Sequence, residues 1–199
     1  MRKLICSLVL GSLLLLGLAQ TALGQEIGLD PEPNREPDSE IEVEYLSPMW
    51  ENRQLDTSSL NVFFHKSDFP RHPNLSFYTG ATLTHAWGYI TEENTNRDDE
   101  AVGIGPVCLI RYQPWQGEKM SFSVDMSGGL IFYNENFPLG GDFYNFMWRL
   151  GPKLTYMLNE HYWLSVSCKI MHVSNGQHGR SRNPSYNGQG VSVSVMKKM

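Results

Sequence analysis

The chain has 199 residues, the length of a single domain, with 16 Lys and Arg against 21 Asp and Glu and a formal net charge of −5. This mildly acidic balance contains no basic cluster, which argues against nucleic acid as a partner. After Leu18, no apolar stretch is long enough to cross a bilayer as a helix.

Residues 1–24 have the pattern of a secretory signal peptide. Arg2 and Lys3 form a short basic start, Leu4 to Leu18 is an almost unbroken apolar run, and Ala22 to Gly24 supply small residues for cleavage after Gly24. The alternative is a membrane anchor, but the run is shorter than the roughly 20 residues that a spanning helix needs. The sequence therefore predicts an exported protein.

Residues 25–40 are rich in Pro, Asp and Glu and contain hardly any apolar side chains. Such a segment cannot bury enough surface to offset its ordering entropy, so we expect a flexible lead-in. The folded domain is expected to span residues 41–199. Cys6 leaves with the signal. Cys108 and Cys168 could pair in an oxidising compartment, but both lie in mid-strand among outward apolar residues, so we expect free, buried thiols.

From residue 41 onward, apolar and polar residues alternate with a period of two, which is the signature of half-buried strands. The clearest case is 143–158, where every even position is apolar or aromatic and the odd positions include Arg149 and Lys153. This run exceeds the ~5–6 residues of an ordinary strand and suits a tilted transmembrane strand of about 9–11 residues with an extension. Strands are predicted in eight segments, in chain order 41–46, 60–66, 77–89, 102–112, 119–133, 143–158, 162–170 and 191–195.

Eight strands without an amphipathic helix predict an all-β fold, an eight-stranded antiparallel transmembrane β-barrel. In such a barrel the apolar face meets lipid and the polar face, here with Asp125, Arg149, Lys153 and Lys169, lines the lumen. A soluble sandwich or lipocalin-like barrel would reverse the two faces. Aromatic residues near strand ends are expected to form the interfacial girdles: Trp87, Tyr89, Tyr112, Trp115, Tyr144 and Trp163.

The segment His172 to Gly176 carries the candidate chemistry. Residues two apart on a strand share a face, so His172 and Ser174 are expected to point together toward lipid. Polar groups in lipid are costly and usually functional. An imidazole can take the hydroxyl proton as the oxygen attacks an ester, while Asn175 and the backbone N–H groups beside Gly176 could stabilise the oxyanion. The alternative is that both are ordinary polar residues at a strand end.

Three segments resemble the lipid A 3-O-deacylase (PagL-like) family: Gly140 to Phe146, the motif His172-x-Ser174-Asn175-Gly176, and Asn183-Pro184. The resemblance implies an eight-stranded outer-membrane barrel whose catalytic His and Ser face the bilayer. It implies hydrolysis of the ester-linked 3-hydroxyacyl chain at position 3 of lipid A, with no metal or organic cofactor. His172 would then be the general base, Ser174 the nucleophile and Asn175 an oxyanion donor.

The sequence departs from this family at the third catalytic member, where the family has a Glu on the last strand that orients the His. Counting from Pro184, the corresponding position is Gln189, or Asn187 if a short gap is allowed. An amide can orient an imidazole, but it does not stabilise an imidazolium by charge. The alternative function is therefore a non-catalytic structural or lipid-binding barrel that has lost the acid.

The expected partners are lipopolysaccharide as substrate and the surrounding outer-membrane lipid, and a homodimer is left open. Arg180 and Arg182, which follow the motif, are candidates for binding the lipid A phosphates because a guanidinium suits phosphate geometry; a solvated loop is the alternative. A small pore is disfavoured because eight strands leave an interior filled by side chains. The histidines at 65, 72, 85 and 161 show no metal-ligand spacing.

Overall fold

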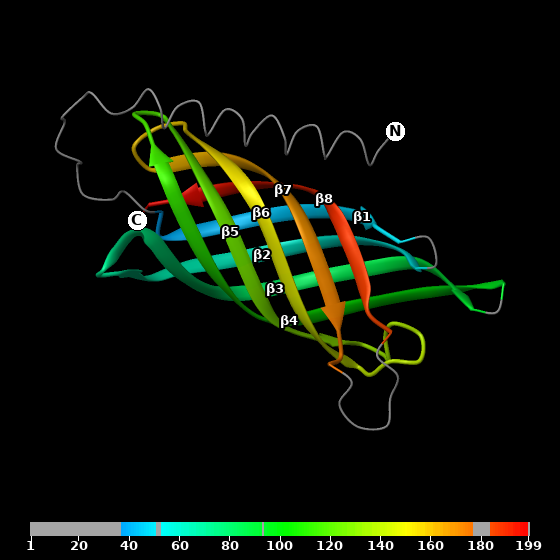
Figure 1. The fold of residues 1–199 in the computed structure, drawn as a ribbon. Helices are drawn as coiled ribbons and strands as arrows, with labels where there is room; N and C mark the ends of the chain where they lie inside the picture. The colour runs from blue at the N-terminus through cyan, green and yellow to red at the C-terminus, as the bar shows by residue number, and fades with distance from the viewer. Residues whose placement is uncertain (1–36, 51–52, 93, 177–183, 199) are drawn as a thin grey trace.

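The computed structural model describes residues 37–50, 53–92, 94–176 and 184–198, which form one closed, tilted barrel (Figure 1). Each strand pairs antiparallel with the next, and β1 closes the barrel against β8. The prediction of an eight-stranded antiparallel barrel is confirmed. The strands are β1 (Ser39–Pro48), β2 (Arg53–Phe69), β3 (His72–Glu92), β4 (Thr95–Gln116), β5 (Met120–Tyr133), β6 (Tyr144–Met157), β7 (Tyr162–Ser174) and β8 (Tyr186–Lys197).

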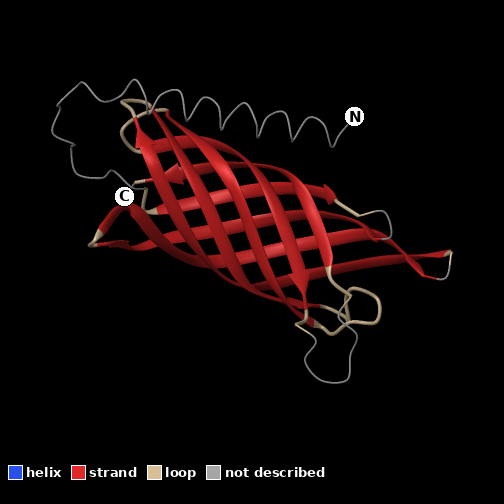
Figure 2. Ribbon diagram, viewed as in Figure 1, coloured by secondary structure: helices blue, strands red, loops and turns tan. Residues whose placement is uncertain are grey.

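Several strands extend beyond the predicted segments. β2 begins seven residues before the predicted 60–66 and β4 seven residues before 102–112. In both extensions the residues on the two faces are largely polar, so the alternation that marks a half-buried strand is hidden. The β3–β4 hairpin projects beyond the rest of the barrel (Figure 2), which explains why its polar residues need no apolar face.

The two faces of the wall separate apolar from polar side chains, with the apolar side chains outside. Val43 and Ile104 are 59% and 60% exposed, whereas Asn61, Arg149 and Lys153 inside are at most 1% exposed. This arrangement fits a barrel surrounded by lipid and contradicts the soluble alternative, which would bury the apolar face. Among the described residues, no helix is long and apolar enough to cross a membrane.

Two predictions about individual side chains need correction. Trp163 is 8% exposed and points into the barrel, so it does not belong to an interfacial girdle; its odd position on β7 places it with the lumenal residues. Cys108 and Cys168 both remain free thiols, but only Cys168 is buried, while Cys108 is exposed on the outer wall.

The lumen is filled by an ion-pair network. Asp125, Arg149, Lys153 and Lys169 point inward as predicted. Their partners include the β1 carboxylates, which sequence reasoning did not assign to the lumen. Among the described residues, four buried carboxylates meet four buried cations, so the lumenal charges balance: Glu40, Glu42, Glu44 and Asp125 against Arg111, Arg149, Lys153 and Lys169.

The β1 carboxylates shift the expected start of the folded part. β1 begins at Ser39, and the Glu40 side chain lies inside the barrel, where it pairs with Arg111 at 2.7 Å and with Lys153. The sequence assigned Glu40 to the flexible lead-in because residues 25–40 are acidic throughout. Composition alone does not distinguish a carboxylate at the start of a strand from one in a solvated segment.

We predict that Glu42→Ala destabilises the barrel by about 3–5 kcal/mol, because it leaves buried ammonium charges without their carboxylate. Glu42 pairs with Lys169 and lies 3.6 Å from Lys153. The loss in free energy of unfolding is measured by urea titration in detergent, with the gel mobility of the barrel as the readout of the folded fraction. The matched control is Glu118→Ala on the exposed β4–β5 turn. Equal unfolding midpoints for the two variants would contradict a structural role for the network.

The two ends of the barrel differ in their connections. At the end that holds Ser39 and Lys197, the turns between strands cover only residues 70–71, 117–119 and 158–161. At the other end, the connections include the longer segments 134–143 and 175–185. Outer-membrane barrels place short turns in the periplasm and longer loops outside. The end where β7 finishes and β8 begins is therefore the extracellular end.

Candidate active site on the outer wall

His172 and Ser174 lie at the extracellular end of β7 and face outward. Val173 between them is fully buried, whereas His172 and Ser174 are both half-buried on the outer wall. They share this face with Leu164, Val166 and Ile170, which are exposed. The alternation of a strand thus places an imidazole and a hydroxyl together, at the edge of an apolar surface.

The imidazole of His172 is held between the neighbouring strands. Trp148 is its direct partner on β6, with the two ring centroids 5.9 Å apart and an interplanar angle of 30°. Asn187 is its direct partner on β8, and the Asn187 Oδ1 lies 2.9 Å from His172 Nδ1. When Nδ1–H donates to Oδ1, the other ring nitrogen, Nε2, is left as the acceptor that a general base requires.

The register decides between the two candidates for the orienting residue. Asn187 is opposite His172, whereas Gln189, the position counted directly from Pro184, is opposite Ile170. Of the two alternatives, the register and the hydrogen bond favour Asn187 over Gln189, and its role as orienting residue stays a prediction. The Asn187 Nδ2 is buried and has no hydrogen-bond partner among the described residues. A carboxylate at this position would carry no such unsatisfied donor.

Ser174 lies where β7 ends, opposite Phe146 on β6. Phe146, Trp148 and Leu150 form an exposed apolar row on β6 beside the candidate pair. In the described part of the chain no hydrogen bond joins His172 to Ser174, and such catalytic bonds are often long until substrate binds. An acyl chain lying against this row would bring its ester to the serine.

Asn175 does not present its side chain to the outer wall. It is fully buried, and its Nδ2 donates to Asp142 Oδ2 at 3.2 Å. This leaves the backbone N–H groups around Asn175 and Gly176 as the oxyanion candidates. Gly176 has a φ of +71°, in the left-handed region that favours glycine. A side chain here would strain the turn that follows Ser174.

Comparisons with known proteins bear on this geometry. The model of the lipid A 3-O-deacylase (PagL) family matches residues 47–196. The chain belongs to the PagL family. The structure is also similar to the crystal structure of the outer membrane enzyme PagL, with a TM-score of 0.56 and 14% sequence identity, covering 78% of this chain and 97% of that one. No match was found among the curated proteins.

Membership of the PagL family, together with the barrel fold, makes this an outer-membrane protein of a family of lipid A deacylases. The family match begins near the end of β1 and extends through β8, so it covers every strand that contributes to the candidate site. Arg180 and Arg182, the predicted phosphate ligands, lie outside the described residues, and their role stays a prediction.

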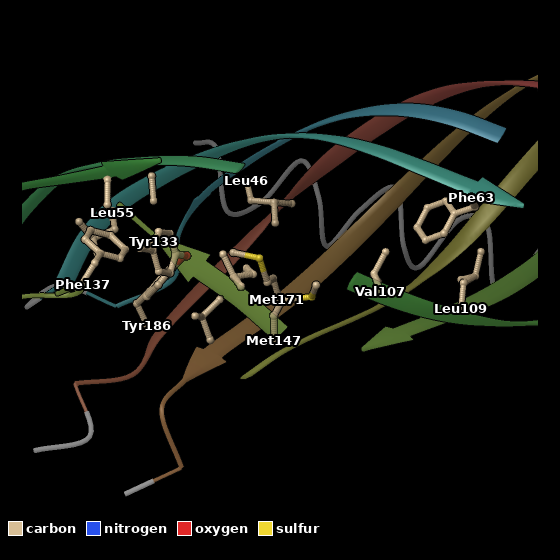
Figure 3. Close-up of a cluster of buried hydrophobic side chains, with 14 of the residues drawn as sticks. Leu46, Leu55, Phe63, Val107, Leu109, Tyr133, Phe137, Met147, Met171 and Tyr186 are labelled. Atoms are coloured by element: carbon tan, nitrogen blue, oxygen red, sulfur yellow. The ribbon is translucent and has the colours of Figure 1, made fainter. Parts of the chain in front are cut away.

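Contacts behind the wall were missed by sequence reasoning. Tyr186, fully buried next to Asn187, shares a hydrogen bond of 2.8 Å with Tyr133. Phe137 packs against both rings at the same end of the lumen (Figure 3). Arg53 donates to the Ser185 carbonyl just before β8. These residues come from β2, the end of β5 and the β5–β6 loop, so only the folded barrel brings them together.

Proposed function

We propose that this protein hydrolyses the ester-linked 3-hydroxyacyl chain at position 3 of lipid A by a serine-esterase mechanism. The observation that carries the proposal is the placement of His172 and Ser174 on the outer wall, with Asn187 bonded to the imidazole from β8. The pair lies at the extracellular end, where lipopolysaccharide occupies the outer leaflet. Residues 1–24 would direct export as a signal peptide, as the sequence predicts.

The proposed reaction begins with attack of the Ser174 hydroxyl oxygen on the ester carbonyl carbon, while His172 Nε2 takes the hydroxyl proton. The negative charge that develops on the carbonyl oxygen would be met by the backbone N–H groups around Asn175 and Gly176. Collapse breaks the bond between the carbonyl carbon and the sugar oxygen, and the imidazolium gives its proton to that oxygen, which leaves as a hydroxyl group. Water then hydrolyses the acyl-serine by the same proton transfers, releasing a 3-hydroxy fatty acid.

The surroundings of the pair support a lipid substrate rather than a soluble ester. The outward row of Phe146, Trp148 and Leu150 continues from the serine toward the middle of the wall. Apolar side chains in a line offer an acyl chain a surface that is already in contact with lipid. The substrate would therefore enter sideways from the bilayer, with its sugar at the level of His172 and its chain along β6.

Release of a 3-hydroxy fatty acid tests the proposal. Purified protein in detergent is incubated with lipid A carrying a 3-hydroxyacyl ester at position 3, and the products are identified by mass spectrometry. We expect a loss of that chain alone. Release of acyl chains from other positions would contradict the assigned regiochemistry.

The second candidate function is a non-catalytic structural or lipid-binding barrel, and the amide at position 187 favours it. This reading predicts unchanged lipid A in the assay and no covalent reaction of Ser174 with a serine-directed phosphonate. Labelling at Ser174 would eliminate it.

A further inference from the structure

The indole of Trp148 lies against the imidazole of His172 on the outer wall. Their strands, β6 and β7, are neighbours (Figure 1), and the register places the two residues directly opposite each other. The ring centroids are 5.9 Å apart, with an interplanar angle of 30°. On its other side Trp148 is opposite Gly128 on β5, which has no side chain. Of the two residues that flank the indole across the sheet, His172 alone therefore offers it a side chain.

The outer wall around His172 offers the ring no carboxylate on the two neighbouring strands. The nearest outward residues described on β6 and β8 are all neutral: Phe146, Trp148, Leu150, Asn187 and Gln189. The ring nitrogen Nδ1 lies 2.9 Å from an amide oxygen, that of Asn187. An amide accepts the ring N–H but carries no net charge, so the positive charge that develops on His172 during proton transfer needs another source of stabilisation.

An aromatic face supplies such stabilisation. The π system of a ring is negative above and below its plane, and a cation within about 6 Å of the centroid is attracted to it, most strongly by tryptophan. The attraction grows when water is excluded. Trp148 belongs to the apolar face of the wall and is 40% exposed there, where its surroundings are lipid rather than water. The separation from His172 lies within the range of this interaction.

We propose that Trp148 stabilises the imidazolium of His172 and so supplies part of the charge compensation that a carboxylate at position 187 would give. The proton moves from the Ser174 oxygen to His172 Nε2 and then to the leaving sugar oxygen, and no bond forms to the indole. Trp148 acts through His172, as a positioning and charge-stabilising residue. This inference rests on the proposed function, because it concerns the base of the same reaction.

Trp148→Leu is expected to lower turnover of lipid A about tenfold. KM should change little, because leucine keeps an apolar surface beside the acyl chain. Trp148→Phe retains a weaker aromatic face and should have an intermediate rate. The matched control is Tyr156→Leu, which removes an exposed outward aromatic from the other end of β6 and should keep the wild-type rate. Equal turnover in Trp148→Leu and the wild-type protein would overturn the proposal.

The same exchange in the Asn187→Asp protein separates a charge effect from a packing effect. A carboxylate at position 187 already compensates the imidazolium, so Trp148→Leu should then cost less than about threefold, and the two changes should not be additive. A tenfold loss in both backgrounds would contradict the proposal, because the packing of an indole does not depend on the charge at position 187.

Fluorinated tryptophans placed at position 148 test the aromatic face without changing the shape of the wall. Each added fluorine withdraws electron density from the ring and weakens its attraction for a cation. Turnover should fall stepwise with the number of fluorine atoms, while the gel mobility of the folded barrel stays constant. A rate that does not change across the series would overturn the proposal and leave Trp148 as an apolar contact.

Tryptophan emission gives a readout that needs no turnover, because a protonated imidazole against an indole quenches its emission more strongly than a neutral one. Emission of the folded barrel is compared at about pH 8 and about pH 5. The change seen in His172→Gln is subtracted, since His85 also stacks on Trp87. We expect a His172-dependent loss on acidification that is absent in Trp148→Leu. No such loss would overturn the proposal, whereas this loss in a protein without deacylase activity would refute the proposed function alone.

Discussion

Ser174→Ala is expected to abolish release of the 3-hydroxy fatty acid from lipid A. Loss of the nucleophile in a serine hydrolase lowers turnover by a factor on the order of 10⁶, because the remaining groups cannot form the acyl intermediate. The change removes one half-buried hydroxyl from a strand end, so the barrel should fold normally. Mass spectrometry of the products and gel mobility of the folded protein measure the two effects separately.

The control for this prediction is Thr79→Ala, which removes a hydroxyl from the outward face of β3, away from the site. It should release fatty acid at the wild-type rate. His172→Ala should lose activity together with Ser174→Ala, and the double variant should be no worse than either, because the two groups act as one unit. Additive losses in the double variant would contradict a shared role.

Asn187→Asp is expected to raise turnover by about 10²–10⁴-fold. In a serine protease, the opposite exchange from carboxylate to amide costs about 10⁴, partly through a wrong imidazole tautomer. Here an amide lies 2.9 Å from His172 Nδ1 and could offer either its donor or its acceptor to the ring. Aspartate has the same shape, accepts only, and stabilises the imidazolium by charge. Initial rates of lipid A deacylation measure the gain.

Gln189→Glu is the matched control for the carboxylate. It adds the same charge to the same wall of β8, but opposite Ile170 rather than His172, so its turnover should stay at the wild-type level. Equal gains for the two variants would show that charge near the site matters and contact with His172 does not. No gain in Asn187→Asp would contradict the assignment of Asn187 as the orienting residue.

The barrel could be predicted because the alternation of apolar and polar residues along a strand is a local property of the sequence. Alternation with a period of two identifies a strand and its two faces at once, as 143–158 and β6 illustrate. The rule gives no signal where both faces are polar, as at the start of β4. Trp163 was assigned to a girdle by its position near a strand end, although its odd position on β7 already placed it on the lumenal face. The β1 pattern of alternating Glu with Ile41, Val43 and Tyr45 was the available signal for the lumenal carboxylates.

The candidate site was predictable to the extent that it depends on one strand. His172 and Ser174 share a face by strand geometry alone, whereas the partner of His172 depends on the register of β8 against β7, which the sequence pattern does not specify. A shift of one residue pair separates Asn187 from Gln189. The Asp142–Asn175 hydrogen bond and the Tyr133–Tyr186 hydrogen bond depend on closure of the whole barrel. No local sequence pattern predicts either contact.

The most direct measurement of the central claim is the reaction of the folded barrel in detergent with a serine-directed phosphonate, followed by peptide mapping. If His172 activates Ser174 on the outer wall, the adduct should form on Ser174 and should disappear in His172→Ala. A protein that stays unlabelled, or that is labelled at Ser174 just as fast without the imidazole, would contradict the account.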